Sequence, residues 1–204
     1  MTTHDTTHAL VLVDLQYDFC PGGALAVADG DATIAVARAL QPRFEIVVAT
    51  QDWHPPEHAS FARNHPGTTV GQVIDVAGAP QVMWPAHCVQ HTHGAELHAG
   101  LDLARITHVV QKGIDPAIDS YSGFFDNGHL RSTGLGDWLR GRGVTALTVL
   151  GLATDYCVKF TVLDARQLGF DVDVVGAGCR AVESYSGAGA RALDAMRSAG
   201  ARIV

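Results

Sequence analysis

Three side chains that could carry out nucleophilic catalysis lie at the ends of strand-like segments. Asp14, Lys112 and Cys157 end or follow apolar runs, at residues 9–15, 106–111 and 144–150. Ligands of open parallel sheets bind beyond the carboxyl ends of the strands, so we expect these side chains to converge. A carboxylate there can take the thiol proton, and an ammonium stabilises the thiolate. Each residue alone could be a loop cap, a solvated strand end or a core cysteine, but their joint occurrence favours catalysis.

Cys157 falls where a strand gives way to a helix. The segment GLATDYCV, residues 151–158, follows the apolar run, and a helical pattern continues to residue 168. Thr154 and Asp155 are good N-cap residues, which places Cys157 in the first helical turn. The positive end of the helix favours the thiolate, and the free backbone N–H groups of the turn can hold an oxyanion. The alternative is a small buried cysteine of the core.

A second group of residues has the chemistry of a metal site. Asp52 and His54 are two residues apart in an extended segment, so their side chains point the same way. His87 can add a third ligand, and two histidines with one carboxylate suit Zn²⁺, Fe²⁺ or Mn²⁺. Ser60 is placed to reach the ion directly or through water. The spacing of Asp52 and His54 alone is weak evidence for a metal site. Eight of the 11 histidines lie within residues 54–108, and this concentration strengthens the evidence.

The apolar periodicity predicts strands that alternate with helices. The expected strands are residues 9–15, 45–50, 106–111, 144–150, 171–175 and 201–204, and the expected helices are 31–40, 94–100, 135–142, 156–168 and 188–199. Such alternation indicates an α/β protein with a mainly parallel sheet. Between the second and third strands, a long segment with little periodicity holds the metal candidates, which is typical of a functional region. We expect a single domain over residues 9–204 and a poorly ordered tail at residues 1–8.

Composition narrows the class of protein. The 204 residues are 47% hydrophobic and 17% charged, which is typical of a compact globular domain. A net charge of −7 without a basic run disfavours nucleic acid or an anionic membrane as a partner. No signal peptide or spanning segment is recognisable, and the four cysteines are scattered, so we expect reduced thiols and a cytoplasmic location.

Lysine is rare in this chain, where Lys112 and Lys159 contrast with 12 arginines. A lysine at a structured position is therefore expected to do what arginine cannot, which is to present a compact ammonium with a tunable pKa.

The sequence motifs of other enzyme classes are missing. The chain has no Gly-x-Gly-x-x-Gly after a strand, no phosphate-binding loop and no Gly-x-Ser-x-Gly elbow, which disfavours NAD binding, nucleotide hydrolysis and a serine hydrolase.

Five sequence blocks together resemble the nicotinamidase/pyrazinamidase family of the isochorismatase-like cysteine hydrolases. The blocks are VDLQYDF (13–19), QDWHP (51–55), WPAHCVQ (84–90), KG (112–113) and GLATDYCV (151–158). Each block is moderately specific, and five in the right order are very specific. The resemblance extends from about residue 9 to the C-terminus. It implies a six-stranded, mainly parallel sheet with helices on both faces, and hydrolysis of nicotinamide, and of pyrazinamide, to the acid and ammonia through a cysteine thioester.

The resemblance also implies roles for individual residues. Asp14, Lys112 and Cys157 match the family's catalytic triad. Asp52, His54 and His87 match its metal ligands, with Ser60 contacting the ion through water and Zn²⁺ expected ahead of Fe²⁺ or Mn²⁺. The backbone N–H groups of Thr154 and Cys157 match the oxyanion hole, with a cis peptide bond expected between Ala153 and Thr154. The expected substrate-binding residues are Phe19, Trp84 and Tyr121, with Gln16 and Leu25 nearby.

Two alternatives remain open from the sequence. A related cysteine hydrolase could act on another small amide, such as a carbamoyl amino acid, but such an enzyme is not expected to carry the Asp52, His54 and His87 set. The chain could instead be a metal-binding or thiol-sensing module without turnover. A small-molecule substrate, and neither nucleic acid nor a membrane, is the expected partner. The sequence leaves open whether the chain forms a homo-oligomer.

Overall fold

Six strands form the main sheet of the computed structural model, which describes residues 7–204. The strand order is β5-β2-β1-β6-β7-β8, and each neighbouring pair is parallel. The strands are β1 (Thr7–Val13), β2 (Ile46–Asp52), β5 (His108–Lys112), β6 (Val144–Leu152), β7 (Asp171–Arg180) and β8 (Arg202–Ile203). The predicted six-stranded α/β sheet is thus confirmed.

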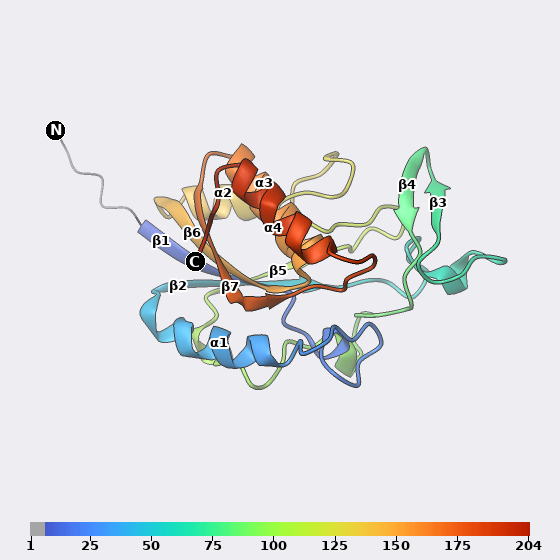
Figure 1. Cartoon of the computed structure of the whole chain (residues 1–204), viewed down its shortest axis with the longest axis horizontal. Coiled ribbons are helices and arrows are strands. Elements are labelled where there is room, and N and C mark those ends of the chain that lie inside the picture. Colours follow the sequence, from blue (N-terminus) through green and yellow to red (C-terminus); the bar gives the residue numbers. More distant parts are fainter. Residues whose placement is uncertain (1–6) are drawn as a thin grey trace.

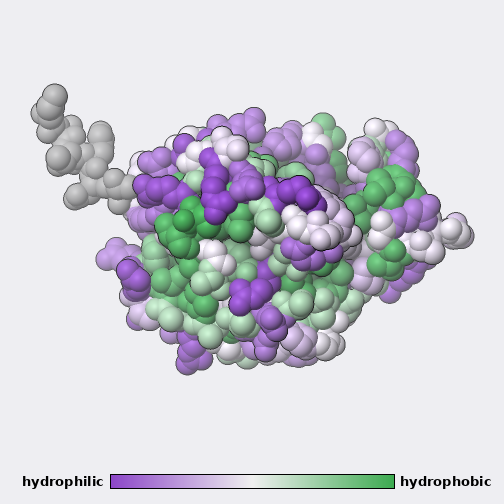
Figure 2. Space-filling view, viewed as in Figure 1, coloured by the Kyte–Doolittle hydropathy of each residue, from purple (hydrophilic) through white to green (hydrophobic). Residues whose placement is uncertain are grey.

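Helices cover both faces of this sheet (Figure 1). Helix α1 (Ala32–Leu40) lies on one face, and α2 (Leu135–Arg140), α3 (Lys159–Gln167) and α4 (Ala188–Ser198) lie on the other. Helix α4 buries small and apolar residues, among them Ala192 and Met196, while hydrophilic side chains cover the outside of the upper helices in Figure 2. Within residues 7–204, no helix combines the length and the apolar character needed to cross a membrane.

The centre of the core is formed by β1 and β6. Residues 9–13 of β1 have no exposed surface, and all of β6 except Thr145 is buried. A parallel strand that is covered on both faces needs apolar side chains at every position, because neither face meets water. This explains why β1 and β6 are continuous apolar runs in the sequence.

The parallel register decides which polar residues meet at the edge of the sheet. Asp52 and Lys112 are register partners at the ends of β2 and β5. Asp14 is the first residue after β1, and Cys157 lies in the turn that follows β6. Because these four strands are neighbours and run in the same direction, their carboxyl ends bring the four side chains to one place.

The N-terminal strand is longer than predicted. β1 begins at Thr7, so Thr7 and His8, which we assigned to the tail, belong to the sheet. The His8 ring is fixed there by a contact of 3.0 Å between its Nε2 and the Thr148 hydroxyl of β6. Residues 1–6 of the predicted tail lie outside the described residues. The single domain over residues 9–204 stays a prediction.

The long segment between β2 and β5 contains an element that periodicity did not indicate. β3 (Val73–Val76) and β4 (Ala79–Val82) form an antiparallel hairpin that projects from the body of the protein (Figure 1). Each strand has only four residues, which is too short for a clear alternation. The helix expected at residues 94–100 is also wrong, since a single 3₁₀ turn, His93–Ala95, forms there.

Gly151 marks a close approach between the two central strands. Its φ is +140°, and a Cβ atom at this position would lie 2.1 Å from the carbonyl oxygen of Val13.

We expect Gly151→Ala to lower the free energy of unfolding by about 3–5 kcal/mol, as measured by urea denaturation. Gly136→Ala in α2 is the control, because its Cβ would make only an ordinary contact of 3.4 Å. It should raise stability by about 0.5–1 kcal/mol, and equal effects of the two variants would contradict this account.

Candidate active site

The buried ammonium group of Lys112 connects the polar side chains at the edge of the sheet. Its Nζ lies 2.9 Å from Asp14 Oδ2 and 2.5 Å from Asp52 Oδ1, and it donates a hydrogen bond of 2.9 Å to the carbonyl oxygen of Ser120. The Cys157 Sγ atom is 3.5 Å away. Lys112 is only 1% exposed, so its charge depends on these neighbours rather than on water. The structure therefore brings together the three side chains of the predicted triad.

Thr50 fixes the orientation of Asp14. The Thr50 hydroxyl donates a hydrogen bond of 2.6 Å to Asp14 Oδ1 and accepts one of 3.1 Å from the Asp14 backbone N–H. The second carboxylate oxygen, Oδ2, accepts no hydrogen bond of good geometry within residues 7–204. Asp14 has a φ of 48°, a left-handed conformation that aspartate tolerates better than most residues. One carboxylate oxygen is thus anchored, and the other remains able to take a proton.

The pKa values of the two carboxylates beside Lys112 are shifted in opposite directions. Burial raises the pKa of Asp14 and outweighs the attraction of the Lys112 ammonium. Burial acts on Asp52 in the same direction, but Lys112 and His54 together hold the pKa of Asp52 well below its ordinary value. The pKa of Lys112 is raised well above its ordinary value, because Asp14 and Asp52 more than offset its burial. Asp14 is consequently the better base, whereas Asp52 keeps its negative charge.

The expectation that the helix end would favour a Cys157 thiolate is wrong. Burial raises the pKa of Cys157 well above its ordinary value; Lys112 opposes this shift, and Asp14 and Asp52 add to it. The side chain is 6% exposed, so loss of hydration dominates over the partial charge at the start of the helix. Cys157 is a thiol at neutral pH and needs a base before it can act as a nucleophile.

The turn that carries Cys157 also differs in detail from the prediction. Residues Thr154–Val158 form a π-helical turn that continues into α3, and Ala153, not Thr154 or Asp155, is the N-cap residue. The Asp155 carboxylate instead accepts the backbone N–H groups of Val182 and Glu183, at 2.9 and 3.0 Å. Asp155 thereby attaches a distant segment to the turn.

The expected position of the cis peptide bond is wrong by one residue. The cis bond joins Leu152 to Ala153, not Ala153 to Thr154. The backbone stays in register with β7 as far as Leu152, which pairs with Arg180, so the chain leaves the sheet at the next peptide. The predicted oxyanion donors, the N–H groups of Thr154 and Cys157, stay a prediction.

Asp52, His54 and His87 form a cluster that suits a divalent metal ion. Their potential ligand atoms all lie within 4.8 Å of one another, and the three side chains are buried. The Nε2 atoms of His54 and His87 lie 3.4 and 3.7 Å from the same oxygen, Asp52 Oδ2. Their Nδ1 atoms contact the carbonyl oxygens of Gly113 and Pro85, at 2.9 and 2.8 Å. Because carbonyls only accept, each Nδ1 carries a hydrogen, and Nε2 is the atom of each ring that faces Asp52 and would bind a metal ion.

Ser60 and His58 lie beside this cluster and interact with each other. The Ser60 hydroxyl is 2.8 Å from His58 Nδ1, and the Ser60 backbone N–H also points to Nδ1 at 3.3 Å. Burial lowers the pKa of His58 to about 4, so its ring is neutral. The predicted contact between Ser60 and a metal through water stays a prediction.

A narrow pocket leads to the Cys157 thiol. Its volume is about 20 Å³, which is close to the space that one water molecule needs. The lining includes Phe19, Leu25, Trp84 and Tyr121, four of the five side chains expected to surround a substrate. Residues that we did not predict also line it: Asp119, Ala153, Tyr156 and Val182. Tyr156 was recognisable in principle, because it precedes Cys157 in the first helical turn.

Gln16 is the exception among the expected pocket residues. Its side chain is completely buried and bonds the backbone of Asp52 from both sides, donating to the carbonyl oxygen and accepting from the N–H, each at 2.8 Å. It also donates to the carbonyl oxygen of Ala95. Gln16 therefore holds the end of β2 in place and does not line the pocket.

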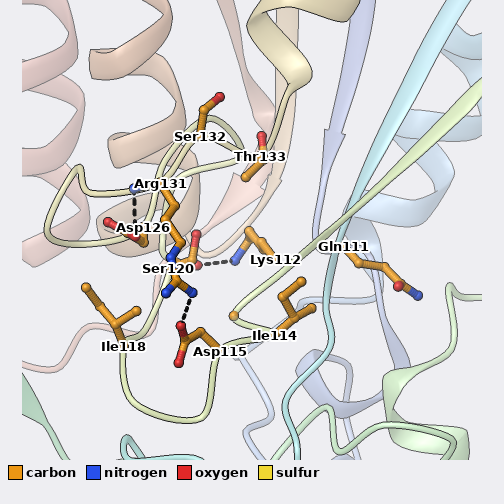
Figure 3. A pocket seen from close by; sticks show the side chains of 11 residues that line it. Gln111, Lys112, Ile114, Asp115, Ile118, Ser120, Asp126, Arg131, Ser132 and Thr133 are labelled. Atoms are coloured by element: carbon orange, nitrogen blue, oxygen red, sulfur yellow. Dashed lines mark hydrogen bonds and ion pairs between the residues drawn. The ribbon is translucent and has the colours of Figure 1, made fainter.

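A second, larger cavity is lined by Lys112 and by residues of the segment that follows β5 (Figure 3). Its volume is about 200 Å³, and its lining includes Ile114, Ile118 and Ser120. Arg131 and Asp115 form an ion pair across its wall. Cys157, Asp52 and His87 line the smaller pocket and not this one, so the smaller pocket is the candidate active site.

A family model and a curated relative both match most of this chain. The model of the isochorismatase domain matches residues 8–204. The chain is 55% identical to the nicotinamidase of Escherichia coli over 178 residues, which cover 85% of this chain and 83% of that protein.

Solved structures extend this likeness to the fold. A nicotinamidase/pyrazinamidase from Acinetobacter baumanii has a TM-score of 0.94 and 42% identity, covering 98% of this chain and 96% of that one. A protein from L. infantum in complex with nicotinate has a TM-score of 0.85 and 37% identity, over 98% and 92% of the two chains. The pyrazinamidase of Pyrococcus horikoshii in complex with zinc has a TM-score of 0.79 and 36% identity, over 97% and 98%. This chain belongs to the isochorismatase family.

Proposed function

We propose that this protein is a nicotinamidase, an amidohydrolase that converts nicotinamide to nicotinate and ammonia, and that it also accepts pyrazinamide. The observation that carries the proposal is the contact of Lys112 with both Asp14 and Cys157, beside a metal-type cluster of which Asp52 and His87 line the same pocket as Cys157. The names of its relatives, with 55% identity to the Escherichia coli nicotinamidase, support this substrate. The cytoplasmic location expected from the cysteines stays a prediction.

Asp14 starts the reaction as the base for Cys157. The Asp14 pKa is raised by burial, and its Oδ2 has no polar partner other than the Lys112 ammonium in the described chain, so it can accept the thiol proton. The thiolate then attacks the amide carbon. Lys112 stays protonated throughout, because its pKa is raised by the neighbouring carboxylates, and it stabilises the sulfur's negative charge at 3.5 Å.

Backbone N–H groups at the start of the Cys157 turn receive the charge that develops on the amide oxygen. The first N–H groups of a helix have no intrahelical partner, and the Cys157 N–H lies in this turn. One such donor lowers the barrier by roughly 3–4 kcal/mol. We assign Cys157 as one donor and keep Thr154 as a candidate for the other.

Asp14 also completes the two half-reactions. It returns the proton to the departing nitrogen, which leaves as ammonia, while the acyl group remains on sulfur as a thioester. A water molecule then attacks the thioester, Asp14 accepts the water's proton and passes it to the departing sulfur, and the thiol is regenerated with release of the acid. The same buried carboxylate thus acts as base and then as acid in each half-reaction.

The aromatic wall and the metal cluster position the substrate. Phe19, Trp84 and Tyr121 enclose a flat ring, and the Trp84 indole N–H donates a hydrogen bond of 3.2 Å to the Tyr121 hydroxyl, which holds two walls together. Asp52, His54 and His87 would hold a divalent ion, zinc ahead of iron or manganese, and this choice is supported by the zinc-bound relative. When bound, such an ion supplies an electrophilic site for the ring nitrogen of nicotinamide.

Replacement of the nucleophile tests the function directly. Cys157→Ala should release ammonia from nicotinamide at least about 10,000-fold more slowly than the wild type, because no thioester can form. Cys179→Ala removes another buried thiol, in β7 and outside the pocket, and should keep near-normal turnover. A wild-type protein that releases no ammonia, or a Cys157→Ala variant with appreciable activity, would sink the proposal.

Metal removal tests the role of the cluster. Dialysis against a chelator should lower the rate about 100-fold or more, and Zn²⁺, Mn²⁺ or Fe²⁺ should restore it, since the ring would lose its fixed position. His54→Ala should contain little metal by elemental analysis. His93→Ala, whose side chain is 70% exposed, should retain the wild-type content. An undiminished rate in chelated protein would rule out positioning by a metal.

The Lys112→Arg variant tests whether the positive charge of residue 112 is sufficient for activity, or whether the shape of the ammonium is also needed. The planar guanidinium cannot occupy the place of an ammonium that lies within 3.5 Å of Asp14, Asp52, Ser120 and Cys157. We expect kcat/KM for nicotinamide to fall by about 100-fold or more. Lys159→Arg, the same change at the chain's other lysine, should have little effect. Near-normal activity of Lys112→Arg would mean that only its charge matters.

A further inference from the structure

Asp119 is a buried carboxylate in the candidate active site that neither the triad nor the metal cluster uses. It is 5% exposed and lines the same narrow pocket as Asp52, His87 and Cys157. Burying a negative charge without a partner is costly, so a carboxylate in this position calls for a compensating group.

The visible contacts of Asp119 leave its charge without a cation. Its Oδ1 accepts the Ser120 backbone N–H at 2.8 Å, and its Oδ2 accepts the Gln81 side-chain amide at 3.2 Å. Both donors are neutral, and each oxygen keeps a further lone pair. No lysine or arginine forms an ion pair with Asp119 in the described part of the chain.

The nearest metal-type residues are two histidines. One nitrogen of His54, one nitrogen of His58 and one oxygen of Asp119 lie within 4.8 Å of one another. His54 also belongs to the cluster with Asp52 and His87, so Asp119 borders the same region from another side. Asp119 comes from the segment after β5, whereas Asp52 is the last residue of β2.

The hydrogen bonds of His58 indicate that it is a donor and not a metal ligand. The Ser60 backbone N–H points to His58 Nδ1, so Nδ1 accepts, and a neutral ring then carries its hydrogen on Nε2. This buried Nε2 has no hydrogen-bond partner within residues 7–204. One nitrogen of His58 lies within 4.8 Å of an Asp119 oxygen, so His58 borders Asp119 on the side of His54.

Charge balance explains why a second carboxylate is needed. Asp52 is the only charged member of its cluster with His54 and His87, and its Oδ1 is 2.5 Å from the Lys112 ammonium. A divalent ion would therefore face one carboxylate that a lysine already partly neutralises. At low dielectric, a further negative charge nearby contributes strongly to the affinity for a dication.

We propose that Asp119 is a positioning residue of the metal site, which supplies its second negative charge on the side next to His54 and His58. This inference rests on the metal cluster of the proposed function and adds a residue to it. Asp119 increases the affinity of the site for the ion and takes no part in the reactions of the triad.

The test is the zinc affinity of Asp119→Asn. Asparagine keeps the shape and one acceptor oxygen and removes the charge. Metal-free protein would be titrated with Zn²⁺ in competition with a coloured chelator, without substrate. We expect the zinc dissociation constant to rise by roughly 10–100-fold, as for other residues that support metal ligands, while the unfolding midpoint of the metal-free protein stays unchanged. Asp119→Glu, which restores the charge, should recover part of the affinity.

Two controls separate charge from structure. Asp115→Asn removes a carboxylate of the same segment that pairs with Arg131 and does not line the pocket, and it should bind zinc like the wild type. Gln81→Leu removes the hydrogen bond from β4 to Asp119 and leaves the charge, so its zinc affinity should change less than about 3-fold.

The outcomes distinguish this inference from the proposed function. An unchanged zinc affinity in Asp119→Asn, or an equal loss in Gln81→Leu, would overturn the role of the Asp119 charge. A wild-type protein that binds zinc tightly but does not hydrolyse nicotinamide would refute the function and leave the inference intact. A wild-type protein without measurable zinc affinity would refute the inference together with the metal part of the function.

Discussion

The burial of the Lys112 ammonium is the constraint on which the site depends. A cation that is 1% exposed must be surrounded by acceptors and negative charges, because water cannot compensate it. Asp14, Asp52 and the Ser120 carbonyl meet this need, and each comes from a different segment of the chain. Loss of either carboxylate would leave the ammonium with a single buried counter-charge. Lys112 thus ties the nucleophile's base to the metal cluster.

The same ammonium gives its two carboxylate neighbours different tasks. Asp52 is also surrounded by His54 and His87, so its pKa stays low and it remains an anion. Asp14 is held by the neutral hydroxyl of Thr50, and burial outweighs the attraction of Lys112, so its pKa is raised. Neighbouring carboxylates with separated pKa values are a usual basis for acid–base catalysis. The proposed mechanism needs this separation, because the buried Cys157 thiol does not ionise by itself.

Several residues were easy to recognise but were given the wrong task. Gln16 was expected in the pocket, yet it bonds the backbone of Asp52, 36 residues away along the chain. Asp155 was expected to cap its own helix, yet it holds Val182 and Glu183. A side-chain amide or carboxylate has similar local surroundings in either task. The choice between them depends on which distant backbone groups are left without a partner, and folding decides that.

The sequence by itself determined the alternation of strands and helices, the strand ends at which Asp14, Lys112 and Cys157 lie, and the metal-type spacing of Asp52 and His54. These features depend on local periodicity and on the rule that parallel strands present their carboxyl ends together. Only the tertiary structure decided that Cys157 is a thiol, that the cis bond precedes Ala153, and that Asp119 enters the pocket. Desolvation and hydrogen bonding depend on which segments pack together, and no short stretch of sequence contains that information.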